Sequence, residues 1–292
     1  YEFKEICING RLGKIPQIRL ILKLVKEIKN YNPDLVHVSG LQLQGFYATL
    51  ATRLAGVKNI LLIVRGSTTE MINFSKVSKW IFGSIIEPIT LRMAKIVYTV
   101  CYAMAEKPLI KNNTKNFGGV VHNAIPNINL NDYSKISIRK ELNISHSDVL
   151  VVYTGRVTKE KGLHYALDAF RSIENAKFII CGTGSHYNEF MTTYSEEIKM
   201  GKVHFLGDRK DIINVLTGCD IFLFPTLHEN LSNSLLEACV VGLPSVVTNV
   251  GGNPEVIRDG INGFLVEPHD SMAIVEALKL LKFKKKGGNI IC

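Results

Sequence analysis

The chain has 292 residues, of which 46% are hydrophobic and 21% charged, and its formal net charge is +9. This length suits two domains that each bury a core, and the hydrophobic share argues against a disordered chain. The six cysteines are scattered without a C-x-x-C spacing, which argues against a disulfide framework or a zinc site and favours reduced thiols in a cytosolic protein.

The first half of the chain alternates helical patterns with short apolar runs. Residues 15–30 predict an amphipathic helix with basic residues beside its apolar face, which consists of Ile18, Leu22, Val25 and Ile28. The apolar runs predict strands at 35–39, 59–64, 96–100 and 119–122. We expect a Rossmann-like domain over residues 1–126.

The second half has the same rhythm more strongly. Residues 127–148 are predicted to be a linker because they are rich in Asn, Ser and Asp. Strands are predicted at 149–154, 177–181, 203–206, 220–224, 245–248 and 263–266. Between them, helical spacing connects Leu163, Leu167, Phe170 and Ile173. Alternating strands and helices predict a second Rossmann-like domain, over 149–292, with ligands at the carboxyl ends of its parallel strands.

The charge of the chain is uneven. Residues 1–148 carry 20 Lys and Arg against 10 Asp and Glu, whereas residues 149–292 carry 15 against 16. A basic half suits an anionic partner, either nucleic acid or an acidic membrane surface, although a solvated basic face is the simpler interpretation.

Two loops of the second half contain residues that suit a phosphorylated ligand. Gly155 and Arg156 follow strand 149–154, with Lys161 close behind. A glycine lets the chain turn at the strand end, and an Arg and a Lys together suit a diphosphate. Two solvated loop cations are the alternative. Gly251 and Gly252 follow strand 245–248 and allow close backbone approach, or form a plain turn.

A helix that opens after strand 220–224 and runs to about Val241 is the other candidate. Glu229 precedes this helix and Glu237 lies inside it. The first turn of a helix is a natural phosphate seat, and a carboxylate is the usual partner of two ribose hydroxyls. Alternatively, Ser234 and Glu237 match a capping box, in which case Glu237 only caps the helix.

Together these segments resemble the retaining glycosyltransferases of family 4, which have the two-domain GT-B fold. The resemblance runs through VVYTGRVTKEKGLHYALDAF, FIICGTGSHY, VHFLGDRKDI, CDIFLFPTLHENLSNSLLEACVVGLPSVVTNVGGNPEVI and DGINGFLV, in register over nearly all of 149–270. Glu229 and Glu237 match the two glutamates of the E-x7-E motif of that family. The first half resembles the acceptor domain more loosely.

The resemblance implies a role for each candidate residue. Arg156 and Lys161 would neutralise the donor diphosphate, and Glu229 would contact the transferred sugar. Glu237 would bind the ribose, and the loop around Arg209 would border the base. The full set implied to bind substrate is Gly155, Gly182, Gly184, Arg209, Asn230, Leu231, Ser232, Asn233, Glu237 and, in the first domain, Arg65. No metal or other cofactor is expected.

The chain also departs from the family pattern. Arg65 stands where many members carry a histidine, so no catalytic base is assigned there. The glycine-rich loop after the first strand of the family is missing, and the sequence after Leu281 degenerates into Lys284-Lys285-Lys286-Gly287-Gly288. We therefore expect a chain truncated at both ends, with an incomplete first domain.

The function expected from sequence is retaining transfer of a hexosyl or N-acetylhexosaminyl group from a nucleoside-diphosphate sugar to a lipid-linked or envelope glycan. The alternative is a fragment that binds the nucleotide sugar without turnover. The basic half and the helix at 15–30 predict peripheral attachment to the cytoplasmic face of an anionic membrane. Nucleic acid is not expected as a partner, because no helix-turn-helix, zinc finger or aromatic–basic platform is present.

Overall fold

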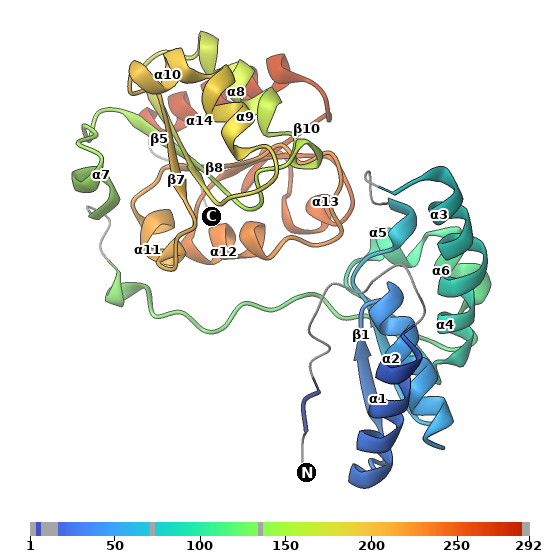
Figure 1. The fold of residues 1–292 in the computed structure, drawn as a ribbon. Coiled ribbons are helices and arrows are strands. Elements are labelled where there is room, and N and C mark those ends of the chain that lie inside the picture. The colour runs from blue at the N-terminus through green and yellow to red at the C-terminus, as the bar shows by residue number, and fades with distance from the viewer. Residues whose placement is uncertain (1–3, 7–16, 71–73, 134–136, 288–292) are drawn as a thin grey trace. The chain divides into compact units, whose positions relative to one another are not determined.

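The computed structural model describes residues 4–6, 17–70, 74–133 and 137–287. The chain divides into two compact units, Tyr1–His122 and Asn123–Cys292 (Figure 1). Each unit is built on its own parallel sheet, in agreement with the predicted α/β fold class.

Unit 1 contains a four-stranded parallel sheet in the order β1-β2-β3-β4. Its strands are β1 (Val36–Ser39), β2 (Ile60–Val64), β3 (Ile96–Thr99) and β4 (Phe117–Val120). Its helices are α1 (Ile18–Tyr31), α2 (Leu43–Leu54), η1 (Thr68–Glu70), α3 (Lys76–Ile81), η2 (Phe82–Ile86), α4 (Glu87–Met93), α5 (Tyr102–Ala105) and α6 (Pro108–Asn113). Only β4 begins more than one residue from its predicted position, where the register with β3 shifts between Val97 and Tyr98.

The amphipathic helix expected at 15–30 forms as α1, and the later half of its predicted apolar face, Val25 and Ile28, packs inside the unit. Leu24 and Ile28 are buried in a cluster with Ala51 of α2. Only Ile18 and Leu22, at the start of the helix, keep large apolar side chains exposed. Residues 15 and 16 lie outside the described residues. Packing against α2 therefore explains the amphipathic pattern in the later part of α1, but not at Ile18 and Leu22.

Unit 2 contains a six-stranded parallel sheet in the order β10-β9-β8-β5-β6-β7. Its strands are β5 (Val149–Thr154), β6 (Ala176–Cys181), β7 (Val203–Gly207), β8 (Ile221–Phe224), β9 (Ser245–Thr248) and β10 (Gly263–Val266). Its helices are η3 (Leu130–Asp132), α7 (Ser137–Glu141), η4 (Lys159–Lys161), α8 (Leu163–Ser172), α9 (Tyr187–Thr193), α10 (Ser195–Lys199), α11 (Ile212–Thr217), α12 (Asn233–Val241), α13 (Asn253–Val256) and α14 (Ser271–Gly287). The strand order reverses at β5, between β6 and β8, which is the point where doubly wound sheets bind ligands.

The core of unit 2 extends beyond the predicted domain boundary. Every residue of β5 is buried, as expected for a central parallel strand. Ile138 and Ile144, which lie in the predicted linker 127–148, are buried in the same core. Arg139 of α7 donates to the Gly218 carbonyl at 3.0 Å and to the Asp220 carboxylate at 2.6 Å. The second part of the predicted linker is therefore integrated into unit 2.

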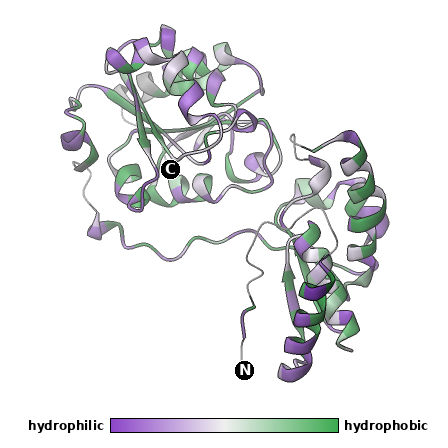
Figure 2. Cartoon of the chain, in the orientation of Figure 1, coloured by the Kyte–Doolittle hydropathy of each residue, from purple (hydrophilic) through white to green (hydrophobic). Residues whose placement is uncertain are grey.

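The described cysteines are reduced, and the described helices are too short or too polar to span a membrane. Cys101, Cys181, Cys219 and Cys239 are free thiols, and the first three are buried, whereas Cys7 and Cys292 lie outside the described residues. None of the helices that the structure describes combines the length and the apolarity needed to cross a bilayer. Figure 2 shows the hydrophobic strands at the centre of each unit.

Candidate functional site

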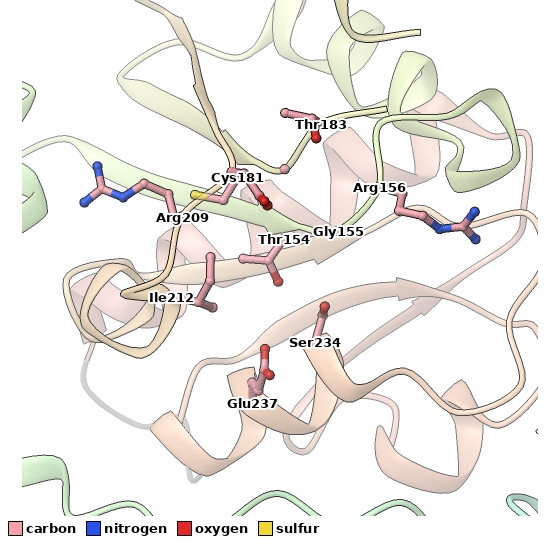
Figure 3. Close-up of a pocket in the computed structure, with 11 residues that line it drawn as sticks. Thr154, Gly155, Arg156, Cys181, Thr183, Arg209, Ile212, Ser234 and Glu237 are labelled. Carbon is pink, nitrogen blue, oxygen red and sulfur yellow. The ribbon is translucent and has the colours of Figure 1, made fainter. Parts of the chain in front are cut away.

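A pocket of about 290 Å³ opens at the carboxyl ends of β5, β6 and β7 in unit 2 (Figure 3). It is lined by Thr154, Gly155, Arg156, Cys181, Gly182, Thr183, Asp208, Arg209, Ile212, Ser234 and Glu237. Five of these residues, namely Gly155, Arg156, Gly182, Arg209 and Glu237, were candidates from sequence. The pocket lies where the topology of a doubly wound sheet places a ligand.

Glycines bring the two central strand-end loops together on one side of the pocket. Gly182 has φ +135°, and a Cβ at this position would lie 1.9 Å from the Gly155 carbonyl oxygen. A Cβ on Gly184 would lie 2.4 Å from the Val157 oxygen. Only glycine permits these approaches, and Gly155 itself has φ +146°. Gly182 and Gly155 thus expose backbone to the pocket, whereas Gly184 supports the loop from behind.

The opposite wall of the pocket is the beginning of α12. Ser232 is the N-cap of this helix, and its hydroxyl accepts from the Leu235 N–H at 3.3 Å. The capping box proposed for Ser234 and Glu237 is therefore wrong, because the helix begins two residues earlier than that box requires. The Glu237 side chain instead points toward the pocket in Figure 3. Burial raises the pKa of this carboxyl above its ordinary value.

Lys161 and Glu229 form a buried ion pair. The Lys161 Nζ lies 2.8 Å from the Glu229 carboxylate, and the side chains are only 11% and 17% exposed. The ammonium also lies 5.5 Å from the centroid of the Phe224 ring, within range of a cation–π contact. Gly162, with φ +63°, lets the loop approach the Pro225 carbonyl, where a Cβ would come within 1.9 Å. Lys161 is therefore not a solvated loop cation.

Tyr153 connects this ion pair to the edge of the pocket. Its hydroxyl donates to the Arg156 carbonyl at 2.8 Å, and its ring stacks on Phe224, with 6.1 Å between centroids. Burial raises the pKa of the Tyr153 hydroxyl far above its ordinary value, so the phenol stays a neutral donor. Through Tyr153, the loop that bears Arg156 is thus connected to Phe224, the ring that Lys161 contacts.

The two glycines that follow β9 lie directly behind Glu229. Gly251 has φ +54°, and a Cβ there would lie 1.8 Å from the Glu229 carbonyl oxygen. The Gly252 N–H donates to the Asn230 carbonyl at 2.6 Å. The sequence Gly251-Gly252 is therefore more than a plain turn, because it supports the segment that leads into α12.

The two arginines of the pocket differ in how firmly they are held. Arg156 is 66% exposed and its guanidinium lies 3.4 Å from Glu160. The Arg209 guanidinium donates to Glu141 at 2.6 and 3.0 Å and to Asp211 at 2.9 and 2.8 Å. These carboxylates raise the pKa of the Arg209 guanidinium, so it stays protonated, and their negative charges compensate its positive charge. Arg156 is the arginine of this pocket that is available to an anionic ligand.

The remaining candidates lie around α12 or in the other unit. Asn230 is buried and no partner is found for its Oδ1, and the Leu231 carbonyl accepts from the Asn123 side chain at 3.0 Å. Ser232 and Asn233 form the start of α12, as described above for the cap. Arg65 follows β2 and belongs to unit 1, whereas all the residues that line the pocket belong to unit 2.

Sequence reasoning missed several residues of the pocket wall. They are Thr154, Cys181, Thr183 and Ile212. Asp208 belongs to the loop around Arg209 that was expected to border the base, and Ser234 belongs to the start of the helix that was expected to bind phosphate. Thr154 and Cys181 are the last residues of β5 and β6, and the rule that ligands lie at strand ends could have found these two. Burial raises the pKa of the Cys181 thiol to about 12, so it contributes shape rather than a thiolate.

The site can therefore hold a ligand that carries both hydroxyls and negative charge. Known proteins with related sequences include glycosyltransferases. The UDP-Gal:alpha-D-GlcNAc-diphosphoundecaprenol alpha-1,3-galactosyltransferase of Escherichia coli is 27% identical over 285 residues, which cover 94% of this chain and 72% of that enzyme. The capsular polysaccharide biosynthesis glycosyltransferase CapM of Staphylococcus aureus is 24% identical over 288 residues, which cover 94% and 74%.

Solved structures of glycosyltransferases have the same fold. The crystal structure of HepE from Anabaena in complex with UDP has a TM-score of 0.75 and 18% identity, covering 92% of this chain and 73% of that one. The lipopolysaccharide outer core galactosyltransferase WaaB has a TM-score of 0.65 and 18% identity, covering 94% and 74%. These likenesses confirm the predicted GT-B type of α/β fold. Residues 134–286 match the family described as Glycosyl transferases group 1, and the chain belongs to this family of glycosyltransferases.

Proposed function

We propose that this glycosyltransferase moves a hexosyl or N-acetylhexosaminyl group from a nucleoside-diphosphate sugar to a lipid-linked or envelope glycan, with retention at the anomeric carbon. The observation that carries the proposal is the pocket at the reversal of strand order in unit 2. Exposed glycine backbone, an available arginine and a carboxylate on α12 meet there (Figure 3).

Each wall of the pocket suits one part of the donor. The Glu237 carboxylate accepts from the vicinal hydroxyls of the ribose, as carboxylates do in other nucleotide sites. The diphosphate lies against the Gly155–Arg156 loop and the first turn of α12, where unpaired N–H groups and the helix dipole favour negative charge. The volume of about 290 Å³ is at the lower end of small-molecule sites.

The chemistry follows from the charges around this pocket. The bond between the anomeric carbon and the diphosphate oxygen breaks, and its electron pair leaves with the diphosphate. Arg156 and Lys161 stabilise that charge as it develops. Glu229 holds Lys161 in place through the 2.8 Å ion pair and contacts the transferred sugar. The acceptor hydroxyl then forms the new bond on the face that the diphosphate left, and its proton passes to the departing diphosphate.

The names of the relatives support the acceptor class. One acts on a sugar linked through diphosphate to undecaprenol, and another belongs to capsular polysaccharide biosynthesis. For this chain we propose an acceptor of the same kind, reached from the cytoplasmic side. Arg65 lies beside a loop of unit 1 in which Ser67 and Thr68 donate to the buried Glu87 carboxylate at 2.6 Å each. This ordered loop is our candidate for acceptor recognition.

An assay of sugar transfer, run with and without a metal chelator, tests the proposal. The purified chain is incubated with UDP-, GDP- or ADP-sugars and an undecaprenyl-diphosphate sugar, and the anomeric configuration of the product is read by NMR. We expect one donor to react with retention, and we expect EDTA to leave the rate unchanged because fixed cations replace a metal. An inverted product would contradict the mechanism. Binding without turnover would make the chain a nucleotide-sugar-binding fragment.

A further inference from the structure

The segment formed by α3, η2 and α4 in unit 1 exposes a row of large apolar side chains. The row consists of Phe74, Val77, Trp80, Ile81, Ile85 and Ile89. Val77 is 68% exposed and Trp80 is 63% exposed. Figure 2 shows hydrophobic residues along this segment. An exposed apolar row of this size is unusual on the surface of a soluble protein and marks a site that binds another molecule or a membrane. We call it the α3–α4 face.

Val77, Ile81, Ile85 and Ile89 follow one another at steps of four residues, and they share one face because the helix contains a π turn. In an α-helix each four-residue step rotates about 40° past a full turn, so a row spaced by four residues drifts around the axis. In η2 the Glu87 N–H donates to the Phe82 carbonyl five residues before it. This wider turn offsets the drift and keeps Ile85 and Ile89 in line with Val77 and Ile81.

The opposite side of the same segment is firmly packed. Glu87, Pro88, Thr90 and Leu91 are buried. The Glu87 carboxylate accepts from the Ser67 hydroxyl and from the Thr68 N–H, both at 2.6 Å. The buried side of this helix is therefore held in unit 1 by packing and hydrogen bonds. The exposed row lies on its solvent-facing side.

The charges on this segment have one sign toward solvent. Between Phe74 and Lys95 the ionisable residues are Lys76, Lys79, Glu87, Arg92 and Lys95. Glu87 is the single acid among them and is fully buried. Lys76, Arg92 and Lys95 are exposed. A partner for this face must accept apolar side chains at its centre and positive charge at its margins.

We propose that the α3–α4 face docks on an anionic phospholipid surface. Such a surface offers both an apolar layer and a negative headgroup region, so it complements the apolar row and the cations at once. Tryptophan is favoured at the level of the headgroups, and lysine stems extend along apolar surface while their ammonium groups reach outward. We assign the membrane contact to this face rather than to α1, because α1 exposes two large apolar side chains, Ile18 and Leu22, whereas this face exposes six.

The single tryptophan of the chain reports directly on this contact. The 292-residue chain is mixed with vesicles of phosphatidylcholine, with or without phosphatidylglycerol, in the absence of nucleotide. We expect the emission of Trp80 to shift to the blue and to become protected from acrylamide only with the anionic vesicles, and the effect to weaken at high salt. Vesicle binding that leaves Trp80 emission unchanged would overturn the proposal, as would the absence of binding.

A pair of double variants locates the surface by co-sedimentation. Val77→Ser with Trp80→Ser removes two apolar anchors, and we expect vesicle partitioning to fall at least about tenfold. Ile18→Ser with Leu22→Ser, at similarly exposed positions of α1, is the matched control and leaves partitioning within about twofold. Equal losses would contradict the assignment. A different outcome would assign the face to a second copy of the chain. In that case the chain would not bind vesicles, would sediment as a dimer, and would become monomeric in the Val77/Trp80 variant. The test needs no sugar nucleotide, so its failure is separate from failure of the proposed transfer.

Discussion

At the scale of single residues, the site depends on charges that are held by neighbours rather than by water. Arg209 is fixed by Glu141 and Asp211, Lys161 by Glu229, and only Arg156 extends into solvent. The cations of this site therefore differ in what they can do. Arg209 gives the pocket a rigid wall, Arg156 is the pocket cation that a ligand can reach, and Lys161 is held next to the pocket by Glu229.

The Lys161–Glu229 pair is expected to stabilise the fold only as a pair. Lys161→Met leaves the Glu229 carboxylate buried without its cation, and should lower the free energy of unfolding by about 3 kcal/mol. Adding Glu229→Gln removes that uncompensated charge and should restore part of the loss. Urea denaturation of the two single variants and the double variant measures the coupling. Losses that simply add would show that the two groups are independent.

The Glu237 carboxylate is predicted to lower the free energy of unfolding at neutral pH. Burial raises its pKa, so its contribution to stability is complete at acid pH and is lost as the pH rises through the native pKa. Glu237→Gln should therefore be more stable than the natural protein at neutral pH, by less than about 1 kcal/mol because the group is partly exposed. The gain should vanish below the ordinary pKa of a glutamate. Melting temperatures across pH test this, and a gain that persists in acid would refute it.

At the scale of elements, the loop after β9 supports the segment that leads into α12. Gly251 and Gly260 both have positive φ, but only Gly251 lies against another backbone, at the Glu229 carbonyl. Gly260→Ala should cost about 1 kcal/mol of stability for backbone strain alone. Gly251→Ala should cost about 3 kcal/mol, since the added Cβ also displaces the segment before α12. Chemical denaturation compares them, and equal losses would argue against the close contact.

The strands of both units could be predicted from sequence because short apolar runs between turn residues leave few alternatives. Glu229 and Glu237 could be placed near a sheet edge for the same reason. The Arg209–Glu141 contact could not, because it joins residues far apart in sequence through α7. The π turn of η2 could not be predicted either. Apolar residues cover both sides of this helix, so their periodicity does not indicate which side is buried.

The start of unit 2 shows where composition misleads. Residues 127–148 have the polar composition of a linker, yet Ile138 and Ile144 enter the core. Arg139 satisfies four acceptors there, including the carbonyls of Ser145 and Asp148. A long-range polar network of this kind leaves no periodic trace in the sequence, which is why the predicted boundary at 149 differs from the unit boundary.

At the scale of the whole molecule, the two units have separate cores, which predicts that unit 2 folds by itself. A fragment of residues 123–292 should unfold cooperatively. A fragment of residues 149–292 loses Arg139 and two buried isoleucines, and should be less stable by at least about 3 kcal/mol. Circular dichroism during urea titration compares the two fragments. Equal stabilities would mean that α7 and the residues after it do not belong to the fold of unit 2.

The central claim is that the pocket of unit 2 binds a nucleoside diphosphate, and thermal stabilisation tests it most directly. The full chain is heated with UDP, GDP, ADP or CMP in the presence of EDTA, because a ligand that binds only the folded state raises the melting temperature. We predict stabilisation by one diphosphate, lost in Arg156→Ala and Glu237→Ala but kept in Glu276→Ala, which changes an exposed carboxylate on α14. Stabilisation that survives in both pocket variants, or that no nucleotide produces, would contradict the account.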